Sequence, residues 1–258
     1  MGRGIVPRLL VAALACAGLG ACQKVDDGRA GTAADFPRPY RPVSELSSNQ
    51  FSTEQARDSK GEAETVMDLA EIEPGMTVAD IGAGEGYYTI RLANRVGAGG
   101  RVLAQDIDEG ALRRLGLRVE REQLGNVSIA LGAEDDPRLP ENSFDRVFLI
   151  HMYHEVAEPY AFLWRLRPAL KENGQVIVVD MDRAPDRHGI WPKLLFCEFD
   201  RTGFQLVEFV RRPEIAGYYA KFEAVGQRPA PSAIEPCAQA DEYDSDPSAD
   251  EVGKGETR

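Results

Sequence analysis

The chain has 258 residues and a formal net charge of −12 at pH 7. Its periodic part, about 170 residues, is long enough to bury a core as one modest domain. A phosphate backbone needs a basic surface, and no aromatic-plus-basic patch offsets the net negative charge of this sequence. The composition therefore argues against nucleic acid as a partner.

The first 21 residues have the features of a signal peptide. Arg3 and Arg8 precede an apolar run over residues 9–19, which is too short to span a bilayer but suits a signal-peptide core. The run ends in Leu19-Gly20-Ala21-Cys22, which resembles the bacterial lipobox. This resemblance implies cleavage before Cys22 and a lipid on that residue. An ordinary cleavable signal, with Cys22 incidental, is the alternative.

Export and a lipid on Cys22 would anchor the protein to the membrane at the periplasmic face. Gln23 follows the cysteine where Asp would be a cue for inner-membrane retention, so the outer membrane is expected. Residues 22–52 are rich in Pro, Ser and charge, and the prolines between Phe36 and Pro42 resist a helix. This composition predicts a semi-extended tether.

The other end of the chain, residues 227–258, is acidic and has few large apolar residues, which predicts a disordered tail. Cys197 and Cys237 either form a disulfide in an oxidising compartment or stay reduced. The apolar neighbours of Cys197 favour a buried free thiol. Neither Cys-x-x-Cys nor His-x-x-x-His spacing occurs, and no metal site is predicted.

Residues 53–226 alternate helix and strand, as a doubly wound α/β sheet requires. Strands are predicted at residues 77–81, 101–106, 127–131, 144–150, 175–180, 204–210 and 218–225. Helices are predicted at residues 61–71, 87–95, 109–124, 159–170 and 191–201. Such a sheet binds its ligand at the carboxyl ends of its strands.

The motif Asp80-x-Gly82-x-Gly84-x-Gly86 follows the first of these strands. In a dinucleotide site a third small residue lies three positions after the second glycine, where this chain has the bulky Tyr87. Asp80 would repel a pyrophosphate but attract a cation, and S-adenosylmethionine carries both a sulfonium and an ammonium group. The motif therefore favours S-adenosylmethionine over NAD.

Asp106 ends the second strand, where an acid can accept hydrogen bonds from both ribose hydroxyls. Ile107 follows it and would cover one face of the adenine. With Ala83 inside the loop, the predicted cofactor residues here are Asp80, Gly82, Ala83, Gly84, Gly86, Asp106 and Ile107. The alternative is that the glycines only make a tight turn and that Asp106 and Asp108 cap the next helix.

Four segments in this order, residues 74–89, 139–147, 153–156 and 170–180, resemble the class I S-adenosylmethionine-dependent methyltransferases of the ubiquinone/menaquinone-biosynthesis-like type. The resemblance covers residues 57–225. It implies a Rossmann-like, seven-stranded, mostly parallel sheet with helices on both faces and the last strand antiparallel. It also implies methyl transfer from S-adenosylmethionine to a small-molecule acceptor.

Two other readings stay open. S-adenosylmethionine is made in the cytoplasm, so an exported chain could be a non-catalytic binding protein of the cell envelope that reuses the fold. A failed export signal, or a start further downstream, would instead give a cytoplasmic enzyme.

The resemblance also directs attention to the loops after the third and fourth strands. In the family an acid after the third strand often binds the adenine amino group, a role for Glu134 or Asp135, although Gly132-Ala133 replaces the usual Gly-Asp pair. A solvated acidic loop is the alternative. After the fourth strand, His154, or else His151, is a candidate general base, and Tyr153 a candidate cation–π contact to the sulfonium. The alternative for all three is a packing role.

Overall fold

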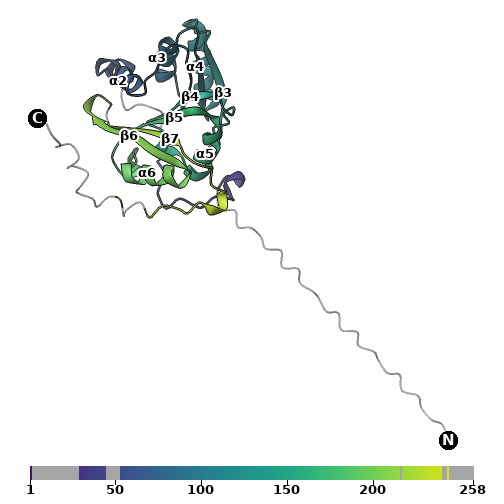
Figure 1. The fold of residues 1–258 in the computed structure, drawn as a ribbon. Helices are drawn as coiled ribbons and strands as arrows, with labels where there is room; N and C mark the ends of the chain where they lie inside the picture. The colour runs from purple at the N-terminus through teal and green to yellow at the C-terminus, as the bar shows by residue number, and fades with distance from the viewer. Residues whose placement is uncertain (2–28, 45–52, 216, 240–242, 244–258) are drawn as a thin grey trace, which may run out of the picture.

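The computed structural model describes residues 1, 29–44, 53–215, 217–239 and 243. The predicted signal peptide and Cys22 lie outside these residues. A seven-stranded sheet with the order β3-β2-β1-β4-β5-β7-β6 forms the centre of the molecule (Figure 1). Within the described residues, no helix combines the length and the apolar character that crossing a membrane requires.

The strands are β1 (Thr77–Ile81), β2 (Arg101–Asp106), β3 (Val127–Leu131), β4 (Phe144–Ile150), β5 (Leu170–Asp180), β6 (Phe204–Arg212) and β7 (Gly217–Ala224). The α-helices are α1 (Glu54–Ser59), α2 (Glu62–Leu69), α3 (Tyr87–Val96), α4 (Glu109–Arg121), α5 (Pro159–Leu166) and α6 (Pro192–Arg201). Short 3₁₀ helices are η1 (Gly31–Ala33), η2 (Tyr153–Glu155), η3 (Arg167–Ala169), η4 (Pro185–Arg187), η5 (Pro213–Ile215) and η6 (Pro231–Ala233).

The first five strands pair in parallel, and β7 runs antiparallel to both β5 and β6. This confirms the predicted fold class. The first four strands have the predicted bounds, whereas β5 begins earlier because Leu170 pairs with Phe144 beyond an irregularity in the ladder. The helix predicted over residues 159–170 ends at Leu166, since Pro168 cannot continue it and a 3₁₀ turn follows.

Helices cover both faces of the sheet because successive strand residues point to opposite sides. Val147 and Leu149 join the core cluster formed with α5 and α6, while Phe148 between them joins the cluster formed with α2 and α3. The middle strands β1 and β4 are buried on both faces, as expected of a parallel sheet. Their carboxyl ends therefore form the edge that is available to a ligand.

Residues 29–44 pack on the domain, which corrects the tether prediction for this part of residues 22–52. Ala33 and Phe36 are buried in the core cluster beside α5, and Arg29 forms an ion pair of 2.6 Å with Glu158. Prolines exclude a long helix here but do not prevent apolar side chains from docking. Residues 22–28 and 45–52 lie outside the described residues.

Residues 227–239 are also ordered against the domain, which corrects the disordered-tail prediction for this stretch. A disulfide with an S–S distance of 2.09 Å joins Cys197 to Cys237, so the favoured free thiol is wrong. Ile234 is buried, and the indole of Trp164 donates a hydrogen bond of 2.7 Å to the carbonyl of Pro229. Figure 1 shows the purple N-terminal and yellow C-terminal segments together below α5.

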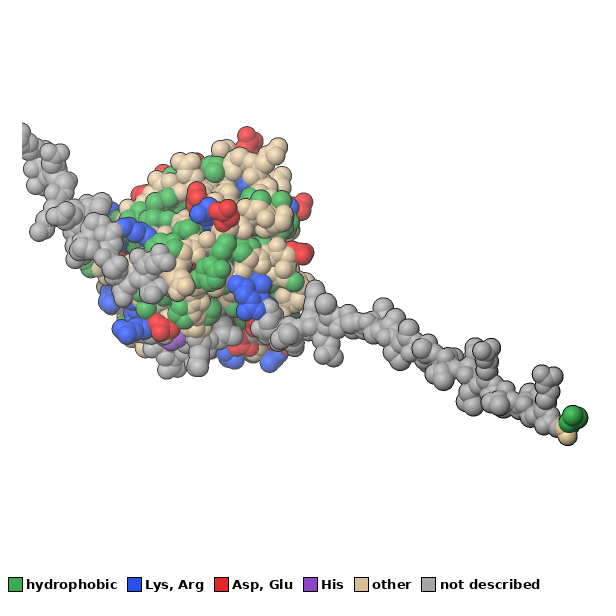
Figure 2. Space-filling view, turned by 90° about the horizontal axis from the view of Figure 1, so that it is seen from below, with side chains coloured by type: hydrophobic (Ala, Val, Ile, Leu, Met, Phe, Trp, Pro, Cys, Tyr) green, Lys and Arg blue, Asp and Glu red, His purple; other side chains and the backbone are tan. Residues whose placement is uncertain are grey.

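Charged side chains on the face shown in Figure 2 are dispersed, with Lys and Arg beside Asp and Glu. Many charged side chains among the described residues form ion pairs, such as the one of 2.9 Å from Arg118 Nε to Glu122. This face therefore presents mixed charge and not one extended basic patch.

Candidate cofactor and acceptor site

The loop between β1 and α3 depends on its glycines. Gly82, Gly84 and Gly86 have φ angles of 68°, 54° and 88°, the left-handed region that favours glycine. A Cβ on Gly86 would lie 2.3 Å from Leu115 Cδ1 of α4. The loop therefore brings the start of α3 against α4 more closely than any side chain at this position would permit.

Asp80 lies in β1 just before this loop and is only 3% exposed. Thr89 of α3 donates a hydrogen bond of 2.6 Å to its Oδ2 atom. Burial raises the pKa of Asp80 to about 6, although the Thr89 bond and the positive charge of Arg57 oppose the rise. A buried acid that is costly to ionise is suited to a cationic ligand group.

A cluster of charged side chains lies close enough to Asp80 for the charge of Arg57 to lower the pKa of that acid. Arg57 of α1 donates two hydrogen bonds, of 3.0 and 2.5 Å, to the carboxylate of Glu62, which begins α2. His151 Nε2, after β4, is 3.7 Å from the same carboxylate. Burial raises the pKa of Glu62, but its contacts with His151 and Arg57 outweigh burial and bring it to about 2. The sequence did not predict this cluster.

Asp106 ties the glycine loop to the second strand. Its carboxylate accepts hydrogen bonds from the backbone N–H groups of Gly84, at 2.8 Å, and Asp108, at 2.9 Å. Asp108, not Asp106, caps α4, through a bond from Gly110. Because an ionised carboxylate has about four acceptor positions, two remain for the hydroxyls of a ribose. Ile107 beside it is half-buried.

The two acids predicted to contact the adenine are placed differently. Asp135 is buried, and its Oδ2 accepts hydrogen bonds from Thr32 at 2.5 Å and from Arg165 at 2.6 Å. Burial raises the pKa of Asp135, but these two bonds outweigh it and lower the pKa. Asp135 thus holds the N-terminal segment to α5, and Glu134 is exposed. Their proposed contact with adenine stays a prediction.

His154 and Asp180 form a buried pair at the adjacent carboxyl ends of β4 and β5. His154 Nδ1 is 2.9 and 3.0 Å from the two oxygens of Asp180, and Oδ1 also accepts the backbone N–H of Met181. Because a carboxylate only accepts hydrogen bonds, this contact assigns a proton to Nδ1. The Nε2 atom has no hydrogen-bond partner among the described residues.

Tyr153 is fully buried, in the packing role that the sequence left as its alternative. Its hydroxyl donates a hydrogen bond of 2.8 Å to Glu198 of α6, and its ring packs on Phe199. Met152, the residue before it, lies against the glycine loop, since a Cβ on Gly82 would be 3.0 Å from its Cγ. The cofactor loop and the segment that carries His154 are therefore in contact.

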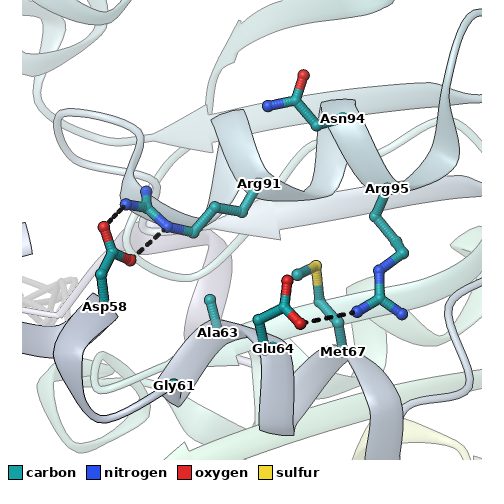
Figure 3. A pocket seen from close by; sticks show the side chains of 8 residues that line it. All are labelled: Asp58, Gly61, Ala63, Glu64, Met67, Arg91, Asn94 and Arg95. Atoms are coloured by element: carbon teal, nitrogen blue, oxygen red, sulfur yellow. Dashed lines mark hydrogen bonds and ion pairs between the residues drawn. The ribbon is translucent and has the colours of Figure 1, made fainter.

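A separate groove of about 600 Å³ lies between α2 and α3 (Figure 3). The pair of Arg91 with Asp58 and that of Arg95 with Glu64 span it, so its charges are mutually compensated. Neither the carboxylates at the sheet edge nor His154 line this groove. It is thus distinct from the candidate site.

Asp180 is the site residue that sequence reasoning missed, although a signal for it exists. It is the last residue of a predicted strand, and in a doubly wound sheet that strand lies next to the one that precedes His154. Arg57 and Glu62 gave no comparable signal, because helices far from the motif position them.

The residues at the sheet edge fit S-adenosylmethionine. The buried Asp80 suits its positive charge, and the glycine loop allows close approach of the backbone. The acceptor positions left on Asp106 suit its ribose. No direct salt bridge compensates Asp80 among the described residues, because the hydrogen bonds of Arg57 go to Glu62.

Part of the chain is similar to known methyltransferases. Residues 79–178 match the model of the methyltransferase domain. Nocamycin O-methyltransferase of Saccharothrix syringae is 39% identical over 85 residues, which are 33% of this chain and 30% of that protein. The ubiquinone/menaquinone biosynthesis C-methyltransferase UbiE of Hydrogenovibrio crunogenus is 31% identical over 118 residues, 45% of this chain and 46% of that protein. The chain thus spans less than half the length of these relatives.

A solved structure is similar in fold. The S-adenosylmethionine-dependent methyltransferase from Aquifex aeolicus has a TM-score of 0.58 at 24% identity, and the match covers 67% of this chain and 98% of that one. The matched domain and the sheet order indicate the methyltransferase fold, and the acids at the sheet edge fit S-adenosylmethionine as its cofactor.

Proposed function

We propose that this protein transfers the methyl group of S-adenosylmethionine to a small-molecule acceptor that binds beside His154. The observation that carries the proposal is one continuous edge of the sheet. Asp80 and Asp106, at the ends of β1 and β2, are suited to the cofactor, and the His154–Asp180 pair at the ends of β4 and β5 is suited to the acceptor.

The cofactor supplies a methyl group on an already activated sulfonium, so the protein has mainly to align the acceptor with it. Asp80 would hold the ammonium group, and Asp106 the ribose. Gly82, Ala83, Gly84 and Gly86 would form the loop beneath, with Ile107 against the adenine.

His154 is the residue that we propose activates the acceptor. Its Nε2 lone pair can take a proton from the acceptor or bind a cation that acidifies it. Tyr153 contributes indirectly, because its bond to Glu198 fixes the turn that carries His154.

A matched pair of acids tests cofactor binding. Asp106→Asn should weaken the binding of S-adenosylmethionine to the full chain at least tenfold in calorimetry, because the amide cannot accept at both positions. Asp108→Asn is the control, since asparagine caps a helix as well as aspartate, and affinity should stay within twofold. If the wild type shows no saturable binding, the proposed function is wrong.

We also propose that the protein is exported and carries a lipid on Cys22, with its domain on the periplasmic side of the outer membrane. The lipobox-like sequence supports this, and so does the Cys197–Cys237 disulfide, since disulfides persist in oxidising compartments. Cells fed labelled palmitate should yield labelled protein in the membrane fraction, and Cys22→Ser should abolish the label. Unlabelled, soluble wild-type protein would refute the anchor.

A further inference from the structure

Three side chains that can bind a metal lie together near the carboxyl ends of β4 and β5, where we propose that the acceptor binds. They are His154 and Glu155 of η2 and His188, which follows η4, and one ligand atom of each lies within 4.8 Å of the others. The two imidazole rings meet edge to face, with their centroids 5.7 Å apart. Glu155 Oε1 is 3.9 Å from His154 Nε2.

His154 is oriented as a metal ligand. A histidine that binds a metal usually donates its second N–H to a carboxylate, which fixes the ring and makes the free nitrogen more basic. Asp180 supplies this carboxylate at 2.9 Å from Nδ1. Nε2 is left without a hydrogen-bond partner among the described residues, on a side chain that is 2% exposed. A buried polar atom without a partner is destabilising, and a bound ion at Nε2 would remove that cost.

We infer that His154, Glu155 and His188 bind a divalent transition-metal ion of the Zn²⁺ type. Two imidazoles and one carboxylate form a ligand set that Zn²⁺ accepts, with ligand atoms about 2.0–2.2 Å from the ion. Tetrahedral geometry then separates ligand atoms by about 3.3–3.6 Å, so small side-chain movements close the observed distances.

The charges around the cluster agree with a divalent cation. Glu155 and Asp180 place carboxylate oxygens at or beside the cluster, where a divalent cation would be attracted. Arg41 is a cation close to the cluster, as its guanidinium donates to the carbonyls of His154 and Val156, but its charge is balanced by Glu198 at 2.8 Å. Ser44 accepts the backbone N–H of His188 at 2.9 Å and so helps to position the third ligand.

Three protein ligands leave a coordination position that takes an oxygen donor, either water or a hydroxyl or carboxylate of a substrate. Provided that the proposed function is correct, this oxygen belongs to the molecule that accepts the methyl group. The metal then acidifies that molecule, a role that the imidazole of His154 would otherwise have alone. The spacing rules applied to the sequence do not detect this set, because its ligands come from two segments far apart in the chain.

Titration of the metal-free full chain with Zn²⁺ in competition with a chromophoric chelator tests the inference. The wild type should bind one ion per chain at this site. His188→Ala and Glu155→Gln, both at positions that are not fully buried, should weaken this binding at least tenfold while their thermal unfolding without metal stays near that of the wild type. His151→Ala is the matched control, because it removes the third histidine of the chain, which also lies beside a glutamate.

A cobalt-substituted sample supplies a second readout, since Co²⁺ held by imidazole nitrogens absorbs visible light. This band should be present in the wild type and His151→Ala and lost in His188→Ala. The inference is overturned if the wild type binds no Zn²⁺, or if all four proteins bind it equally. Neither measurement uses S-adenosylmethionine, so failure here is distinct from failure of the proposed function.

Discussion

Arg41 and Glu198 form an ion pair of 2.8 Å with side chains that are 0% and 1% exposed. Burial lowers the pKa of Arg41, but the charge of Glu198 and its hydrogen bond outweigh burial and raise the pKa. The pair joins the N-terminal segment to α6. Arg41 also donates hydrogen bonds to the carbonyls of His154 and Val156, so the pair lies against the turn that carries His154. Residues 29–44 are therefore part of the folded domain.

Arg41→Met should lower the free energy of unfolding by about 3–5 kcal/mol, because it leaves Glu198 buried without its cation. Urea denaturation monitored by circular dichroism measures the loss. The control is Arg113→Ala, which removes an ion pair with Glu109 whose side chains are 73% and 71% exposed. Its effect should be about 0.5 kcal/mol or less. Equal losses in the two variants would contradict the structural role of Arg41.

The disulfide should contribute comparably to stability. Cys237→Ser should lower the free energy of unfolding by about 2–5 kcal/mol, because the bond constrains the unfolded chain and fixes residues 227–239 to α6. A reducing agent should destabilise the wild type by a similar amount. The variant itself should not respond to the reducing agent, and a response there would assign the effect to other cysteines.

Local sequence patterns predict the sheet well because each strand is a short apolar run bounded by glycine, proline or polar residues. The ends of β1 and β2, with Asp80 and Asp106, follow from the same local signals. What the patterns miss is pairing at long range. The Arg41–Glu198 ion pair and the Cys197–Cys237 disulfide can form only after the sheet has set the positions of α5 and α6. Composition alone therefore predicts no ordered structure for residues 29–44 and 227–239.

The binding of S-adenosylmethionine should weaken as the pH falls through about 6. The pKa of Asp80 is raised to about 6, so the carboxyl group gains a proton below that pH and no longer attracts the ammonium group. Affinity should then fall about tenfold per pH unit. Calorimetry between pH 5 and 8 measures this. Asp80→Asn should bind weakly with a flat profile over this range, and a flat profile in the wild type would refute the role of Asp80.

The same raised pKa predicts a cost in stability. The pKa of Asp80 is about 6 in the folded state and 3.8 as the reference value, so the folded state binds more protons between these values. Its stabilising contribution is complete below pH 3.8 and is lost as the pH rises through 6. Asp80→Asn should therefore raise the free energy of unfolding at pH 7 by up to about 3 kcal/mol, and leave it nearly unchanged at pH 3.5. A destabilised variant at pH 7 would contradict this.

Asp180→Asn should change the tautomer of His154 without removing its packing. The amide can donate a hydrogen bond to Nδ1, which would move the ring proton to Nε2 and occupy the lone pair that faces the acceptor. Nitrogen-15 NMR of the histidine ring should report the change, and Zn²⁺ affinity should fall about 10–100-fold. Asp182→Asn, an exposed acid paired with Arg211, is the control. If the Asp180 variant keeps the wild-type tautomer and Zn²⁺ affinity, Asp180 only fills space beside His154.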